Sequence, residues 1–275
     1  MKPEPIIFTD LDGTLLEHQT YSFAAALPAI ELVKDRAIPL VFCSSKTRPE
    51  IEYWRGRLDN RHPFIAENGG GIFVPFSYFS AGDMDAVGHT AERINGYSVL
   101  VLGTPYPTLR RVLGELQRDG FKIKGFGDMD TSEVAKITRL SPEEAKLAKS
   151  REFDEPFIFQ GGPEELDRLL AAIEGRGLRY SQGKFYHIMG DNDKGKAVDV
   201  LKELYRRKFG DIITIALGDS PLDLPMLEKA DHPVLVQDDK GEHDRRIVLP
   251  NLIRVEGIGP EGWSKAVLEF IQERL

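Results

Sequence analysis

The feature that most constrains this sequence is an apolar segment, residues 5–9, followed directly by Asp10-Leu11-Asp12-Gly13-Thr14. A short apolar run that ends in a turn signal predicts a buried strand. Side chains two residues apart on a strand point the same way, so Asp10 and Asp12 should leave the strand end toward one small volume. Two carboxylates this close repel unless a cation or a shared proton relieves them. Mg²⁺, which prefers oxygen ligands, is the expected cation.

A second acidic segment repeats the pattern. Residues 212–217 are almost wholly apolar and precede Gly218-Asp219-Ser220-Pro221-Leu222-Asp223. In a parallel sheet the carboxyl ends of the strands lie along one edge, so Asp219 and Asp223 should meet Asp10 and Asp12 around one ion. Asp219 could instead only cap the next helix. Two acidic clusters, each after a buried strand, favour the metal site.

Two further segments offer contacts to phosphate. Ser44, Ser45 and Lys46 follow the apolar residues 39–43, where a hydroxyl and the N–H groups of a helix start can hold phosphate oxygens. Lys194 opens a predicted helix at 194–209, a position where the helix dipole disfavours a cation unless an anion binds there. An ordinary helix cap and solvated lysines are the alternatives.

Strand and helix signals alternate along the chain, which predicts an α/β fold with a doubly wound, Rossmann-like parallel sheet. The pattern changes between residues 87 and 189, where strands are expected at 97–102, 156–159, 178–181 and 185–189. We therefore expect a catalytic core made of residues 1–86 and 190–275, with an inserted α/β cap domain at 87–189. Asn68-Gly69, between two apolar segments, predicts a hairpin.

Composition excludes several classes of partner. The net charge of −8 argues against nucleic acid, whose binding needs a basic surface. A single cysteine, Cys43, fits a reducing compartment. The N-terminus does not look like a signal peptide, and no apolar run is long enough to span a membrane. These features predict a cytoplasmic protein that acts on a small molecule; they do not predict its oligomeric state.

Together, the Asp10 motif, Ser44, Lys194 and the Gly218-Asp219 segment resemble the haloacid-dehalogenase (HAD) superfamily of phosphohydrolases, in its members with a large α/β cap. The resemblance implies a hydrolase with Asp10 as nucleophile and Asp12 as general acid and base. It implies Mg²⁺ binding by Asp10, Asp12 (through its carbonyl), Asp219 and Asp223, and phosphate contacts from Ser44, Ser45, Lys46 and Lys194. Leu222 departs from the superfamily pattern, which has Asn at this place.

Shorter strings resemble the mannosyl-3-phosphoglycerate phosphatases: Ser45-Lys46-Thr47, Glu67-Asn68-Gly69-Gly70, and residues 151–155, 183–187 and 259–263. This resemblance implies a phosphoric monoester hydrolase of mannosylglycerate (compatible-solute) biosynthesis that releases phosphate from mannosyl-3-phosphoglycerate. Phosphatases of glucosyl-3-phosphoglycerate or of sucrose-phosphate type, and phosphomutases, remain alternatives. The residues expected to contact the phosphorylated sugar and glycerate are Glu67, Asn68, Gly69, Gly70, Arg151, Lys184 and His187.

Overall fold

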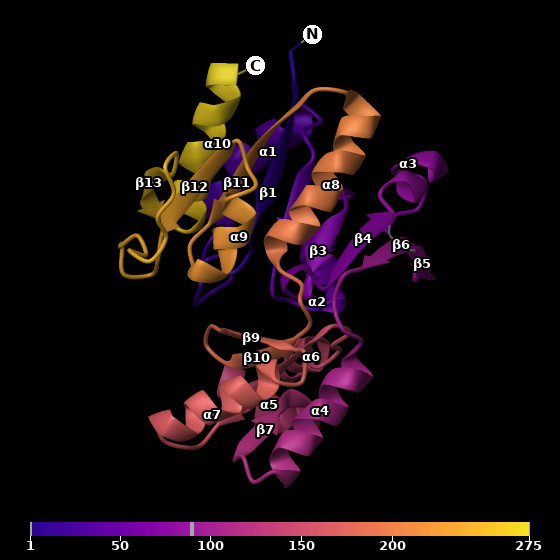
Figure 1. The fold of residues 1–275 in the computed structure, drawn as a ribbon. Coiled ribbons are helices and arrows are strands. Elements are labelled where there is room, and N and C mark those ends of the chain that lie inside the picture. Colours follow the sequence, from indigo (N-terminus) through magenta and orange to yellow (C-terminus); the bar gives the residue numbers. More distant parts are fainter. Residues whose placement is uncertain (1, 89–90, 275) are drawn as a thin grey trace.

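The computed structural model describes residues 2–88 and 91–274, and within them the larger sheet has nine strands (Figure 1). The first six strands in the spatial order are parallel and the last three are antiparallel. This arrangement confirms the predicted doubly wound α/β core. The order of the strands is β13 (Ile253–Ile258), β12 (His232–Gln237), β11 (Ile212–Gly218), β1 (Glu4–Thr9), β2 (Leu40–Cys43), β3 (Phe64–Ala66), β4 (Gly71–Pro75), β6 (Tyr97–Val101) and β5 (Ala91–Ile94).

Helices cover both faces of this sheet. On β1, Ile7 packs into one hydrophobic cluster while Ile6 and Phe8 pack into the other, which explains why this central strand is apolar on both faces. None of the helices in the described part of the chain is both long and apolar enough to cross a membrane. One face carries α1 (Leu27–Asp35), α2 (Arg48–Arg57) and α10 (Pro260–Arg274), and the other α3 (Ala81–Ala86), α8 (Lys194–Phe209) and α9 (Leu224–Leu227).

A separate four-stranded antiparallel sheet lies below the core in Figure 1. Its order is β7 (Ile123–Gly125), β8 (Asp154–Phe159), β10 (Tyr186–Met189) and β9 (Arg179–Gln182). One hydrophobic cluster joins it to α4 (Tyr106–Arg118) and α7 (Pro163–Glu174). A second cluster joins it to α5 (Thr131–Thr138) and α6 (Pro142–Ala148).

The chain changes sheets later than the predicted boundary at residue 87. The expectation that a strand at 97–102 belongs to the insertion is wrong, because β6 pairs with β4 and β5 pairs with β6. Both strands thus extend the core sheet. The pattern of a short antiparallel strand does not reveal which sheet it joins, because either sheet could bury its apolar face. We propose that the inserted cap begins after Val101 and ends at Met189.

The two connections between core and cap run beside each other. Leu102 N and Gly103 N both donate to the carbonyl oxygen of Gly70, at 3.0 and 2.9 Å. A Cβ atom on Gly190, in the returning connection, would lie 2.6 Å from the Thr104 hydroxyl oxygen. Both connections therefore leave the core next to the β3–β4 turn.

The predicted hairpin at Asn68-Gly69 is confirmed, since β3 and β4 pair in antiparallel register. Its turn is η2 (Glu67–Gly69), in which all three residues have a left-handed backbone: φ is 51° at Glu67, 54° at Asn68 and 88° at Gly69. A Cβ on Gly69 would lie 2.1 Å from the carbonyl oxygen of Asp193, the residue before α8. Glycine is therefore needed here for packing as well as for conformation.

This close packing predicts that Gly69→Ala destabilises the protein more than Gly96→Ala does. Gly96 is a matched control, because its φ of 90° is similar but a Cβ there would meet nothing within 4 Å. The backbone penalty of about 1–2 kcal/mol applies to both variants. Overpacking should cost Gly69→Ala about 1–3 kcal/mol more. Urea unfolding measures the difference, and equal losses in the two variants would contradict the packing argument.

Candidate active site

The first functional side chain, Asp10, is bound to a buried lysine. Lys194 Nζ donates to Asp10 Oδ1 and to Asp223 Oδ1, both at 2.6 Å. All three side chains are nearly or fully buried. Burial alone would lower the pKa of Lys194. The carboxylates of Asp10 and Asp223 outweigh this effect and raise that pKa above its ordinary value, so the ammonium stays charged. Lys194 lies at the start of α8 because Asp193 caps the helix, accepting from Lys196 N at 2.8 Å.

Two consecutive hydrogen bonds hold the backbone at the end of β1. The Thr9 hydroxyl donates to the carbonyl oxygen of Asp10 at 2.7 Å, and the indole N–H of Trp263 donates to the Thr9 hydroxyl at 3.0 Å. Trp263 is fully buried on α10. Residues from the two ends of the chain therefore set the position of Asp10.

Three of the four carboxylates that the strand-end argument brings together, those of Asp10, Asp219 and Asp223, meet at Lys194, and the carboxylate of Asp12 does not join them. One oxygen from each of Asp10, Asp219 and Asp223 lies within 4.8 Å of the others. Thr14 Oγ1 donates to Asp219 Oδ1 at 2.7 Å, and the N–H groups of Asp219 and Ser220 donate to Asp223 Oδ2 at 3.1 Å. The side chains are thus held in place by the chain itself.

The electrostatics of this cluster favour a divalent cation. Burial raises the pKa of Asp10 to about 7 despite the opposing charge of Lys194, and Asp223 adds to the rise. Burial, and then Asp223, raise the pKa of Asp219 well above its ordinary value. Three carboxylates facing one ammonium leave two negative charges to be balanced by protons or by an ion. The donor set is all oxygen, so the cluster fits a hard divalent metal.

Asp12 lies outside the three-carboxylate cluster and pairs with Lys46. Lys46 Nζ is 2.8 Å from Asp12 Oδ2 and 3.9 Å from Glu50 Oε1, and it lies 4.9 Å from the centre of the Tyr21 ring. The Lys46 side chain is 7% exposed and that of Asp12 is 32% exposed. Asp12 Oδ1 is buried and has no hydrogen-bond partner among the described residues. The sequence analysis predicts that Lys46 contacts phosphate, and it does not predict the ion pair with Asp12.

The loop after β2 also anchors the cap. Ser44 is buried, and its hydroxyl oxygen accepts from Lys46 N at 3.3 Å. The carbonyl oxygen of Ser45 accepts from Arg151 Nη1 at 2.8 Å. Thr47, which caps α2, donates its hydroxyl to the carbonyl oxygen of Leu147 on α6 at 2.9 Å. Residues predicted to bind phosphate thus lie on the segment that holds the cap.

Glu67 is fully buried and accepts two backbone N–H groups of the cap. Its two oxygens receive Glu152 N at 2.9 Å and Phe153 N at 2.8 Å. Burial raises the pKa of Glu67 to about 8, and Arg151 opposes that rise. A Cβ on Gly70 would lie 2.4 Å from the Phe153 Cβ, so a glycine at this position allows Phe153 of the cap to lie close to the β3–β4 turn.

The other residues predicted to bind substrate are engaged within the cap or between cap and core. His187 Nδ1 lies 2.9 Å from Asp154 Oδ2, which also accepts from Asn68 Nδ2 at 3.5 Å. Arg151 Nη1 lies 3.9 Å from the same carboxylate oxygen. Their contact with substrate stays a prediction, since each now has a partner inside the protein.

Lys184 is exposed in the β9–β10 turn and donates to the carbonyl oxygen of Thr138 at 3.0 Å. Its neighbour Gly183 faces the core, because a Cβ there would lie 3.4 Å from Leu222 Cδ1. Leu222, which replaces the usual Asn, therefore offers an apolar contact toward the cap.

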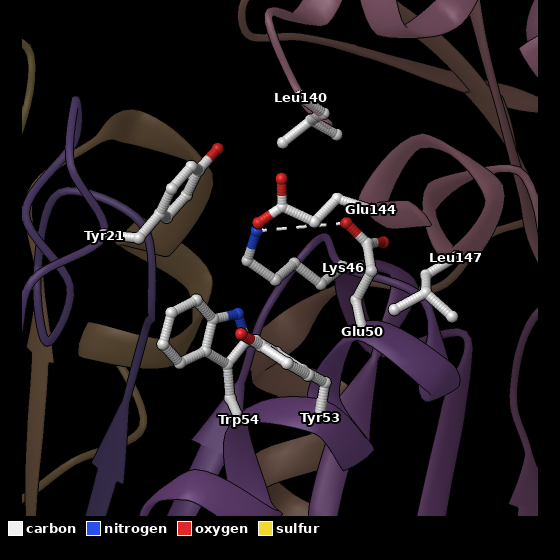
Figure 2. A pocket seen from close by; sticks show the side chains of 8 residues that line it. All are labelled: Tyr21, Lys46, Glu50, Tyr53, Trp54, Leu140, Glu144 and Leu147. Atoms are coloured by element: carbon white, nitrogen blue, oxygen red, sulfur yellow. Dashed lines mark ion pairs between the residues drawn. The ribbon is translucent and has the colours of Figure 1, made fainter. Parts of the chain in front are cut away.

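A pocket between core and cap was missed by the sequence reasoning (Figure 2). It is small, with a cavity volume of about 20 Å³, which is room for about one water molecule. The core contributes Tyr21, Tyr53 and Trp54, and the cap contributes Leu140 and Glu144. The sequence signal for this pocket is the spacing of positions 50, 53 and 54, which places their side chains on one face of α2.

Comparison with known proteins gives the family. Residues 7–86 match the family model of haloacid dehalogenase-like hydrolases. A glucosyl-3-phosphoglycerate/mannosyl-3-phosphoglycerate phosphatase of Methanococcoides burtonii is 48% identical over 97% of both chains. A protein of the same description from Persephonella marina is 37% identical over 98% of this chain and 97% of its own.

A solved structure from Thermoplasma acidophilum shows the same fold, with a TM-score of 0.70 and 18% identity over 98% of this chain and 99% of the other. The alignment with the first relative covers 97% of both chains, so it spans both the core and the cap. The chain therefore belongs to the haloacid dehalogenase-like hydrolases, as a phosphoric monoester hydrolase in the family of glucosyl-3-phosphoglycerate/mannosyl-3-phosphoglycerate phosphatases.

Proposed function

We propose that this chain is a Mg²⁺-dependent phosphatase that hydrolyses mannosyl-3-phosphoglycerate to mannosylglycerate and phosphate, and also accepts the glucosyl analogue. The names of the two relatives, which carry both sugars, support this substrate pair. The observation that carries the proposal is the site itself. Lys194 joins Asp10 to Asp223, while Asp12, two residues along the chain, is held separately by Lys46.

Asp10, Asp219 and Asp223 would hold the metal, together with the backbone carbonyl of Asp12. Their mutual distances and the two negative charges left beside Lys194 support this donor set. When bound, Mg²⁺ neutralises charge that develops on the phosphoryl oxygens.

The protein side chains would carry the reaction in two steps. Lys194 fixes one oxygen of Asp10, so the carboxylate is oriented to attack phosphorus and form an aspartyl-phosphate. Asp12 would protonate the leaving oxygen and then take a proton from the water that cleaves the intermediate. Its Oδ1 is suited to this role, since Lys46 holds Oδ2 and Oδ1 has no partner among the described residues. Ser44 and Lys194 would contact phosphoryl oxygens.

Asp10→Asn should abolish phosphate release from mannosyl-3-phosphoglycerate in Mg²⁺, because an amide cannot act as the nucleophile. Asp12→Asn should lower kcat by about 10²–10⁴-fold, the usual contribution of a general acid and base. Steady-state phosphate release measures both effects, and thermal melts check that the variants fold. Full activity in Asp10→Asn would rule out the covalent mechanism.

Lys46 is proposed to position Asp12, and its variants can separate this role from phosphate binding. Lys46→Met should lower kcat by about 10–100-fold, within the contribution of a placed proton donor, while KM changes little. Lys46→Arg keeps a cation near Asp12 and should recover part of the loss. A rise in KM and weaker inhibition by inorganic phosphate, with kcat preserved, would show instead that Lys46 binds phosphate.

The substrate assignment predicts a preference among phosphate esters. Both hexosyl-3-phosphoglycerates should have a kcat/KM well above those of simple hexose phosphates and sucrose phosphate. Phosphate release with each ester in Mg²⁺ measures this. A clear preference for simple hexose phosphates would defeat the assignment, and dependence on a sugar bisphosphate without net phosphate release would indicate a phosphomutase.

A further inference from the structure

One face of the cap sheet carries three polar side chains from three neighbouring strands. His187 on β10 lies directly opposite Ser181 on β9 and Pro156 on β8, and Asp154 comes two residues before Pro156. Directly opposite residues share a face of a sheet, as do residues two apart on one strand. The other face, which includes Phe157, packs against α4 and α7. We call Asp154, His187 and Ser181 the polar row.

The polar row lies across the strand ends that carry the catalytic side chains. At its β8 end, Asp154 Oδ2 accepts from Asn68 Nδ2, after β3 of the core, at 3.5 Å. At its β9 end, a Cβ on Gly183 would lie 3.4 Å from Leu222 Cδ1, after β11. In the core sheet, β1, which leads to Asp10, lies between β11 and β3. Figure 1 shows β9 and β10 on the side of the cap nearest the core.

The ring of His187 is held by one nitrogen and presents the other. Its Nδ1 lies 3.0 and 2.9 Å from the two oxygens of Asp154, which is fully buried. An ionised carboxylate can only accept, so Nδ1 carries a hydrogen. Nε2 has no hydrogen-bond partner among the described residues. With Asp154 on one side, the ring can hold a second proton on Nε2 and donate it to an anion.

The hydroxyl of Ser181 is a second unused polar group beside this ring. Its oxygen is buried and has no hydrogen-bond partner among the described residues. Directly opposite residues on neighbouring strands have Cβ atoms about 4.5–5.5 Å apart, so Ser181 is a close neighbour of His187. A buried hydroxyl without a partner is costly, which indicates that a ligand or a water molecule completes this part of the protein.

The glycerate carboxylate is the second anionic group of the proposed substrate, and it lies close to the leaving oxygen along the glycerate chain. Two of the cationic cap residues predicted to contact substrate already donate to backbone carbonyl oxygens. Arg151 Nη1 donates to Ser45 at 2.8 Å, and Lys184 Nζ donates to Thr138 at 3.0 Å. His187 is the cationic candidate whose remaining donor lies beside another unused donor.

We propose that the polar row binds the carboxylate of the glycerate group, with His187 Nε2 and the Ser181 hydroxyl donating to its oxygens. Asp154 is the positioning residue that holds the imidazole ring. Arg151 Nη1 lies 3.9 Å from Asp154 Oδ2, so the charge of Asp154 is partly balanced within the protein. The inference rests on the proposed function and deepens it, because it assigns the residues that recognise the acid part of the substrate.

The test compares mannosyl-3-phosphoglycerate with its carboxamide analogue, which differs only in the acid group. The measured quantity is the ratio of kcat/KM for the acid to kcat/KM for the amide, called the acid preference. Hydrogen bonds to a charged group predict an acid preference of about a hundredfold in the wild type. His187→Gln and Asp154→Asn should each lower it at least tenfold. A merely structural role would lower kcat/KM for both substrates equally and leave the acid preference unchanged.

Ser181→Ala should lower the acid preference about threefold without lowering the melting temperature, because the hydroxyl has no partner to lose. The control is Gln182→Ala, since Gln182 is exposed and the next residue on a strand points to the other face. It should keep the wild-type acid preference within twofold.

The outcomes separate this inference from the proposed function. If the wild type hydrolyses mannosyl-3-phosphoglycerate but shows no acid preference, or keeps that preference in His187→Gln and Ser181→Ala, the polar row does not bind the carboxylate and the proposed function stands. If the wild type releases phosphate from neither hexosyl-3-phosphoglycerate, the proposed function and the inference are both refuted.

Discussion

The interaction on which the rest of the site depends is the buried ammonium of Lys194 between Asp10 and Asp223. An unpaired buried charge is strongly destabilising, so each member of this triad requires the others. The sheet supplies them from distant parts of the chain: Asp10 follows β1, Asp223 follows β11, and Lys194 begins the helix that re-enters the core. Asp219 then brings the cluster to a net charge that a divalent ion can balance.

The site and the cap are held by the same short segments. The loop after β2 carries Lys46, which pairs with Asp12, and it also contacts the cap through Ser45 and Thr47. The β3–β4 turn packs Gly69 against the start of α8 and receives the cap backbone on Glu67. The position of the cap is therefore coupled to the geometry around Asp10 and Asp12, because neither segment can shift without affecting both.

What the sequence could predict follows from a simple physical rule. The carboxyl ends of parallel strands share an edge, so the meeting of Asp10, Asp219 and Asp223 followed from two apolar runs with acids after them. The same rule placed the Asp12 carboxylate in this cluster, and that part is wrong because Asp12 turns to Lys46. The pairing of Lys46 with Asp12 could not be predicted, since it depends on the path of a loop and on the direction of a long side chain. The assignment of Glu67 to substrate rests on the family resemblance. Its contacts with the backbone N–H groups of Glu152 and Phe153 could not be predicted, because these residues lie far along the chain. β5 and β6 were misplaced because their sequence is compatible with either sheet.

Calorimetric titration of Mg²⁺ into the metal-free protein tests the central claim most directly, with Asp219→Asn as the comparison. Asp219 contributes to the cluster and is not proposed to react, so its amide variant isolates metal binding from the chemistry. The account predicts one ion bound per chain in the wild type and at least hundredfold weaker binding in Asp219→Asn. Equal affinity in the two proteins, or no binding to the wild type, would contradict it.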